Sequence, residues 1–402
     1  LQRAQQTPFV LPALLYIGAT LLSTIFSVVP RVSFWGSYQR LQGTFSFLAY
    51  VVVFFSILGN LRHREQLDRL LNTVVLTSIP IAVYGWLQHS GLDPLPWGGD
   101  VVTRVAANAG NPIFLAAHLI IAFFVTVERL LHSFRTLLSE QEGNVFEALL
   151  TGVYIFALVV QAVAIIYTQS RGPWLGWAAG LYVFLLVGLI VLRRQWPDRS
   201  PLRLAEVLKA LGAAAGGLLV GALPVYALLA LLKKGWRWLW LTWVIQTLLV
   251  AAFLVIFNLP RSPLSPLRDL PYLGRMGQVF EVESGTGKVR VLIWEGVVEL
   301  LRRNPLRAVV GYGPEAMYVA YNAVYPPDLA HYEARNASPD RSHNETFDAL
   351  VTTGVLGFLA YFFLFGSVFY YSLRWLGMLQ GAPDRNLFLS LSIGGAVGGA
   401  IL

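Results

Sequence analysis

The sequence contains no cysteine, and only 13% of its 402 residues are charged. Without cysteine the chain forms no disulfide, offers no thiolate nucleophile and builds no cysteine-ligated metal site. The scarcity of charge, together with 56% hydrophobic residues and a mean hydropathy of +0.59, excludes a water-soluble domain of this length. These features predict a polytopic integral membrane protein.

The basic residues give the chain a formal net charge of +8, yet their distribution argues against a nucleic-acid partner. Lysine and arginine occur in short clusters between apolar runs, as is typical of loops that anchor membrane helices. We expect no cleavable signal peptide, because the first apolar run, residues 8–30, is too long and lacks a small-residue cleavage site. The chain starts without methionine and stops inside an apolar run, which indicates a fragment of a longer protein.

The apolar runs predict about ten transmembrane helices, the last incomplete, because a membrane-spanning helix needs roughly 20 apolar residues. We therefore expect an all-α fold with about ten or more such helices. The predicted spans are residues 8–30, 44–60, 70–88, 113–131, 145–168, 174–192, 210–232, 238–258, 346–373 and the run from 387 onward.

Short basic loops orient these helices, because lysine and arginine are retained on the cytoplasmic side. Alternate crossings agree with this rule except at residues 210–232, which separate two basic loops that both favour the inside. Glycine and proline loosen that segment, so we expect a re-entrant or surface-lying hairpin there. Residues 259–345 then face the outside, between an N-terminal helix bundle of residues 1–258 and C-terminal helices in residues 346–402.

The outer stretch is predicted to form a cap on the membrane. Its first prolines favour extended chain. Residues 289–303 then show apolar residues at helical spacing and are predicted to form an amphipathic helix near the outer membrane face, ended by Asn304 and Pro305. The apolar face of this helix is predicted to carry Val291, Trp294, Val298 and Leu301.

Three basic residues gather on the outer face under this topology. Arg171 lies in a short turn between two membrane helices, Arg290 opens the amphipathic helix, and His343 belongs to a polar cluster just before an apolar run. Paired guanidinium groups suit phosphate, and a neutral imidazole suits removal of a proton from a hydroxyl. Each residue also has a plainer interpretation: a headgroup-contacting arginine, a solvated helix residue and a helix-start residue.

Several motifs together resemble those of the O-antigen ligase and O-antigen polymerase-like membrane glycosyltransferases. They span about 250 residues in the order that the family shows. The motifs are Gly110-Asn111-Pro112, Ser170-Arg171-Gly172-Pro173-Trp174-Leu175-Gly176, Arg290 with Trp294, Asn304-Pro305, Gly311-Tyr312-Gly313, His343-Asn344, Leu350 and Gly354-Val355-Leu356-Gly357.

The resemblance implies a reaction, a membrane and a set of residues. It implies transfer of a glycan from a polyprenyl diphosphate carrier to an acceptor hydroxyl, at the outer face of a bacterial cytoplasmic membrane. It implies inversion at the anomeric carbon, without metal or other cofactor. Arg171 and Arg290 would hold the carrier diphosphate, and His343 would be the general base. The sugar, the acceptor, the oligomeric state and the choice between ligase, polymerase and protein O-glycosylation stay open.

Five further residues are candidates for substrate binding. Arg40 follows two aromatic residues, as in a sugar or headgroup site, although an interfacial aromatic belt explains it equally well. Arg104 and Arg341 add charge to a diphosphate pocket or are solvated loop residues. Glu345 either orients His343 or supports the start of the following helix. Tyr312 belongs to one of the family-like motifs.

Other classes of site and function have weaker support. His331 and Glu333 with His343 and Glu345 show no helical metal-ligand spacing, and no glycine-rich nucleotide loop follows a strand. A lipid-glycan transporter or flippase remains an alternative, for which charged residues should line a path within the helices. A non-catalytic membrane subunit of a larger assembly is another, for which the basic residues should point apart.

Overall fold

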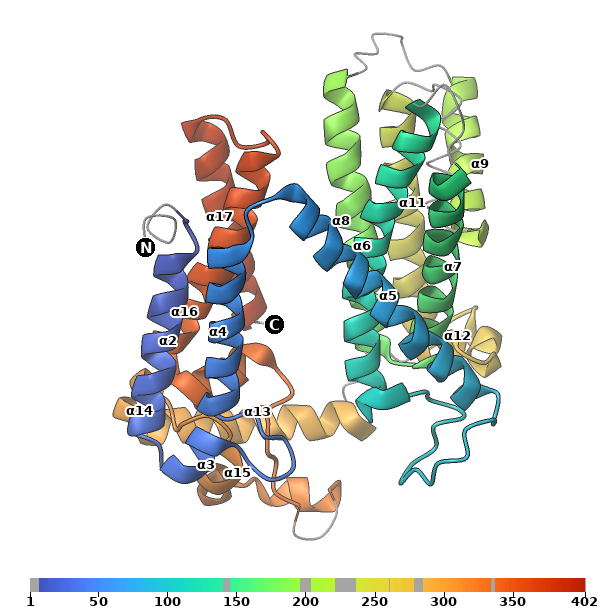
Figure 1. The fold of residues 1–402 in the computed structure, drawn as a ribbon. Coiled ribbons are helices and arrows are strands. Elements are labelled where there is room, and N and C mark those ends of the chain that lie inside the picture. The colour runs from blue at the N-terminus through green and yellow to red at the C-terminus, as the bar shows by residue number, and fades with distance from the viewer. Residues whose placement is uncertain are drawn as a thin grey trace. The chain divides into compact units, whose positions relative to one another are not determined.

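The computed structural model describes residues 7–139, 145–195, 204–220, 236–259, 261–277, 285–333 and 337–401. Every regular element in these ranges is helical, which confirms the predicted all-α fold. The chain divides into two compact units (Figure 1). The terminal unit consists of Leu1–His63 together with Glu281–Leu402, and the central unit is Arg64–Phe280.

Six of the described helices are long and apolar enough to cross a membrane. Three more apolar helices are shorter than the roughly 20 residues that a span needs. They are α2 (Val10–Ile25) with 16 residues, α4 (Thr44–Asn60) with 17, and the apolar stretch Val207–Gly216. The predicted ten or more spans are therefore not confirmed in the described ranges, and much of the hairpin predicted at 210–232 lies outside them. The six are α5 (Arg64–His89), α6 (Pro112–Ser139), α7 (Val145–Tyr167), α8 (Arg171–Gln195), α11 (Trp236–Asn258) and α16 (Glu345–Trp375).

In the central unit, helices α5, α6 and α7 pack against one another, and α11 packs against α8 and α9 (Leu204–Val220). The core between the first three is mostly apolar, and Gln161 is fully buried within it together with Ser78 and Thr126. The Gln161 amide nitrogen donates to the hydroxyls of Ser78 at 2.7 Å and Thr126 at 3.0 Å. Because an unpaired polar group in a lipid-embedded core is costly, these bonds fix how the three helices pack.

In the terminal unit, α2 packs along α16, and the amphipathic helix α13 (Gly285–Arg303) runs across the ends of α2, α4 and α16 (Figure 1). Short helices surround α13 at that end. They are α3 (Pro30–Trp35), α14 (Pro305–Val310), α15 (Met317–Ala320), η3 (Tyr321–Val324) and η4 (Pro327–His331), while α17 (Ala382–Ile401) follows α16.

The structure confirms the amphipathic helix but shifts its buried face by about one position. The residues that α13 buries are Leu292, Ile293, Val297 and Leu300. The predicted residues Val291, Trp294, Val298 and Leu301 are only half-buried at the edges of that face. The reason is tertiary: the helix packs on the aromatic side chains of the segment that follows it, chiefly Tyr321, which is fully buried beside Gly296.

The backbones of α14 and α16 cross at two glycines of the family-like motifs. Gly354 interrupts α16 with φ 67° and ψ −172°, and Gly311 has φ 90°. The interruption frees two carbonyls of α16, so the N–H groups of Tyr312 and Gly313 donate to Val351 at 2.7 Å and Thr352 at 3.1 Å. Side chains at these glycines would collide with backbone atoms, which explains why the crossing needs glycine on both sides.

Candidate functional site

His343 sits in a turn whose two neighbours are fixed, while its own side chain is exposed. Its φ is 56°, in the left-handed region. Before it, the Ser342 N–H donates to Asp348 Oδ1 at 2.8 Å. After it, the Asn344 side chain caps α16 by accepting from the N–H groups of Thr346 at 2.9 Å and Phe347 at 3.3 Å. The imidazole therefore projects from an ordered backbone into accessible space.

Helix α13 holds the same turn from the other side. The indole N–H of Trp294 donates to the Ser342 carbonyl at 2.9 Å, and its ring packs on Phe347 with centroids 6.0 Å apart. Arg290 lies one helical turn before Trp294, on the same side of α13, and is exposed. Trp294 thus ties the helix that carries Arg290 to the turn that carries His343.

Glu345 is the first residue of α16 and is exposed. No hydrogen bond joins it to His343 among the described residues. A carboxylate in the first turn of a helix is stabilised by the unpaired N–H groups and by the helix dipole. The position of Glu345 therefore favours its plainer interpretation, in which it supports the start of α16.

Arg40 and Arg341 tie a loop of the terminal unit in place. The Arg40 guanidinium forms an ion pair with Asp340. Its hydrogen bond to that carboxylate raises the pKa of Arg40, although burial acts in the opposite direction. Arg341 donates to the side chain of Gln42, and Glu315 accepts from backbone N–H groups of the same loop. Both arginines thus have structural partners.

Tyr312 lies in the core of the terminal unit, 6% exposed. Its hydroxyl donates to the Leu300 carbonyl at 2.9 Å, and burial raises the pKa of the phenol. Tyr312 packs α13 against the backbone segment after α14 that crosses α16. Its hydroxyl is therefore engaged within the core of the unit, where it supports α13.

Arg171 belongs to the central unit, where it is the first residue of α8. The turn before it is tight: Gln169 has φ 47°, and the Ser170 carbonyl accepts from the N–H of Trp174 at 3.1 Å. This agrees with the short turn predicted between two membrane helices. Arg171 is half-buried, at the positive end of the helix dipole.

Two other arginines reach the same turn. Arg104 donates from Nη2 to the Ser170 hydroxyl at 3.4 Å, and Arg275 donates from Nη1 to the Gln169 carbonyl at 3.2 Å. The pKa of Arg275 is lowered, first by burial and then by the positive charges of Arg104 and Arg171. Arg275 is not among the residues predicted from the sequence, because it lies in α12 (Leu273–Met276), a four-residue helix in a proline-rich stretch that carries no recognisable motif.

A buried glutamine builds the loop that carries Arg104. The Gln88 carbonyl oxygen accepts from the N–H groups of Ala106 at 3.2 Å and Ala107 at 2.7 Å, while its amide nitrogen donates to Asp93 at 2.9 Å. Burial alone would raise the pKa of Asp93, but hydrogen bonds from Gln88 and its other neighbours outweigh that effect and lower the pKa. Those neighbours are the Leu95 N–H, the Trp97 indole and the Tyr84 hydroxyl.

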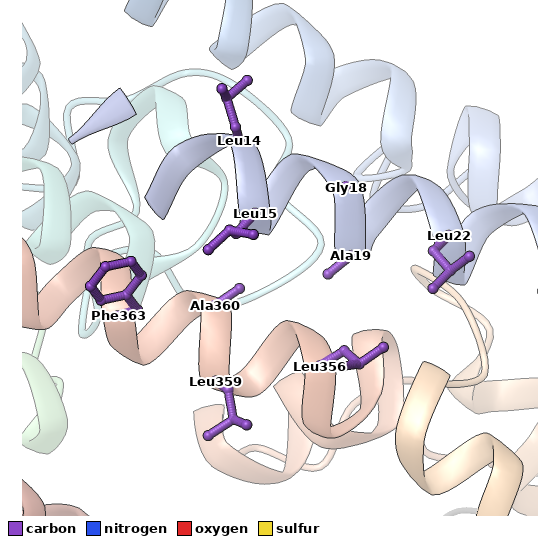
Figure 2. Close-up of a pocket in the computed structure, with 9 residues that line it drawn as sticks. All are labelled: Leu14, Leu15, Gly18, Ala19, Leu22, Leu356, Leu359, Ala360 and Phe363. Atoms are coloured by element: carbon purple, nitrogen blue, oxygen red, sulfur yellow. The ribbon is translucent and has the colours of Figure 1, made fainter. Parts of the chain in front are cut away.

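Each unit also has an apolar hollow. In the terminal unit, a cavity of about 500 Å³ lies between α2 and α16, where Leu15, Ala19 and Ala360 point toward one another (Figure 2). All its lining residues are apolar, so it offers no group for chemistry and suits lipid chains. In the central unit, a cavity of about 380 Å³ lies among aromatic residues that flank Arg171 and Arg275 in sequence. Within the described ranges, no three His, Asp or Glu side chains gather as metal ligands would.

Comparison with known protein families gives one match. The sequence profile described as O-antigen ligase matches residues 156–362, just over half of the chain. The matched range contains Arg171, Arg290 and His343, whereas Arg104 precedes it. Neither the curated proteins nor the solved structures yield a match. With its membrane-spanning helices and this match, the chain belongs to the O-antigen ligase family of membrane glycan-transfer proteins.

Proposed function

We propose that this protein transfers a glycan from a polyprenyl diphosphate carrier to an acceptor hydroxyl, with His343 as the general base. The observation that carries the proposal is the way His343 is presented. Its imidazole is exposed, while Trp294, Asp348 and the Asn344 cap fix the backbone on both sides. A general base needs this combination, because it must reach the substrate proton from a fixed position.

The proposed step is a displacement at the anomeric carbon. The acceptor oxygen forms a bond to that carbon as the bond to the diphosphate oxygen breaks, and the diphosphate leaves with the bonding electrons. His343 takes the proton of the acceptor hydroxyl. Attack from the face opposite the leaving group inverts the anomeric configuration.

Arginine side chains supply the positive charge that the leaving diphosphate needs. In the proposal Arg171 and Arg290 donate charge-assisted hydrogen bonds to its oxygens, and they stabilise it most as its charge increases in the transition state. Because guanidinium groups meet this charge, we propose the reaction as metal-independent. The basic loops predicted on the cytoplasmic side favour an extracytoplasmic site in a bacterial cytoplasmic membrane.

The test is transfer by the purified protein in lipid nanodiscs, supplied with a polyprenyl diphosphate glycan and an acceptor. Loss of a general base typically lowers turnover by about 10²- to 10⁴-fold, so His343→Ala should lose activity on that scale. Arg171→Ala and Arg290→Ala should also lose activity. His331→Ala is the matched control, because His331 is an exposed histidine in the same unit. Undiminished turnover in His343→Ala would overturn the proposed mechanism.

A further inference from the structure

Three arginine side chains of the central unit meet at one turn of the backbone. Arg171 begins α8, Arg104 comes from the loop before η1 (Ala107–Ala109), and Arg275 comes from α12. The hydrogen-bond partners of Arg104 and Arg275 at this turn are neutral: the Ser170 hydroxyl and the Gln169 carbonyl. In the described part of the chain, no carboxylate forms a salt bridge with either residue, and the Arg104 Nε is buried without a hydrogen-bond partner.

Arg104 and Arg275, which have no carboxylate partner among the described residues, are costly to hold together at this turn unless an anion joins them. Like charges at close range repel one another, and this repulsion contributes to the lowered pKa of Arg275. The N-terminus of α8 adds a further partial positive charge at the same place. An anion with several oxygen atoms would relieve the repulsion and accept hydrogen bonds from the planar guanidinium groups. Phosphate and diphosphate have this geometry.

The apolar cavity of the central unit is lined by residues adjacent to two of these arginines in sequence. Trp174 and Trp177 lie one to two helical turns after Arg171 on α8, and Leu273 and Met276 flank Arg275 on α12. Two polar atoms in the lining are already used: Trp174 Nε1 donates to the Ile165 carbonyl at 2.9 Å, and the Tyr272 hydroxyl lies 3.0 Å from His89 Nε2. A third, Trp177 Nε1, is buried without a hydrogen-bond partner. The cavity therefore presents mainly hydrocarbon and ring faces.

We propose that Arg104 and Arg275 act with Arg171 on the diphosphate of an isoprenoid lipid, and that the cavity beside them takes the first isoprene units. The choice of lipid rests on the function proposed above. Charge supports it, because three guanidinium groups match a diphosphate better than the single negative charge of a common phospholipid. One cavity beside one charged cluster also fits a lipid with a single chain.

Binding of farnesyl diphosphate to the purified full-length protein in detergent tests this inference, with inorganic diphosphate measured in parallel. Removing a charge-assisted hydrogen bond typically weakens binding about tenfold or more, so Arg275→Ala and Arg104→Ala should lose at least that much affinity. Arg261→Ala is the matched control, since it removes an exposed arginine from the same unit. Met276→Gln, which puts an amide into the cavity, should weaken farnesyl diphosphate binding and leave inorganic diphosphate binding unchanged.

Each result has a defined meaning. Wild-type affinity in both Arg104→Ala and Arg275→Ala would overturn the inference, and equal affinity for farnesyl and inorganic diphosphate would overturn the role of the cavity. Competition by phosphatidylglycerol as strong as by farnesyl diphosphate would show a general lipid site instead. Unchanged binding of inorganic diphosphate by Met276→Gln also shows that this variant folds, and Arg275→Lys, which keeps the charge, should retain part of the affinity.

The binding assay also separates this inference from the proposed function. His343→Ala should bind farnesyl diphosphate as the wild type does, because His343 acts on the acceptor. If His343→Ala still transfers glycan while Arg275→Ala fails to bind the lipid, only the proposed mechanism fails. If His343→Ala is inactive while Arg275→Ala binds normally, only the present inference fails.

Discussion

Replacement of Gly354 by alanine is predicted to break the crossing of α14 and α16. A methyl group at Gly354 would lie 2.6 Å from the Gly311 nitrogen and closer still to the Val309 carbonyl, whereas real Cβ contacts are essentially never below 3.0 Å. The opposing atoms are backbone, so no side chain can rotate away. The backbone segments of α14 and α16 must therefore separate. This would disturb the site, because His343 lies just before the first turn of α16.

The expected cost follows from the geometry. An alanine at φ 67° and ψ −172° occupies a region that costs about 1–3 kcal/mol for residues other than glycine. Separation also breaks the hydrogen bonds from Tyr312 and Gly313 to the α16 carbonyls, each worth about 0.5–1.5 kcal/mol. The predicted destabilisation is about 2–6 kcal/mol, a large part of the roughly 5–15 kcal/mol that stabilises a typical protein.

The measurement is unfolding of the purified protein in detergent, followed by circular dichroism, together with glycan transfer. Gly366→Ala is the matched control, because Gly366 lies in the same helix and a methyl group there meets nothing within 4 Å. Alanine is favoured over glycine inside a helix by about 0.5–1 kcal/mol, so the control should be neutral or slightly stabilised. If both variants unfold alike, the reasoning from the crossing is wrong.

Three further predictions concern the segments around the candidate residues. Trp294→Phe should keep the ring packing but leave the buried Ser342 carbonyl without its donor, a loss of about 1–3 kcal/mol that faster hydrogen exchange around His343 would reveal. Asn344→Ala should cost about 1 kcal/mol through the lost helix cap, whereas Asn344→Asp should retain it, as thermal unfolding can show. Because the folded-state pKa of Asp93 is lowered, its stabilisation should be complete above the ordinary carboxyl pKa of 3.8 and be lost as pH falls below it. Proteolysis of the 93–106 loop should therefore increase at acid pH in the wild type, and already at neutral pH in Asp93→Asn.

Local sequence patterns predicted the features that depend on a few neighbouring residues. Asn304 follows the last residue of α13, as predicted, because helix termination is a short-range effect. The α4 bounds, Thr44–Asn60, coincide with the predicted apolar run. The predicted number of spans is not confirmed in the described ranges, because apolar composition alone does not show where a helix ends.

The sequence by itself determined the membrane character, the all-α class, the starts of some helices, such as α4 and α7, and the residues His343, Arg171 and Arg290 as candidates. Only the tertiary structure decided which residues meet. It placed Arg275 with Arg104 and Arg171, moved the buried face of α13, and joined the Ser23 hydroxyl to the Thr352 carbonyl across 329 residues of sequence. The physical reason is that helix periodicity and capping act within a few residues. Contacts between distant segments depend on packing, which no local pattern records.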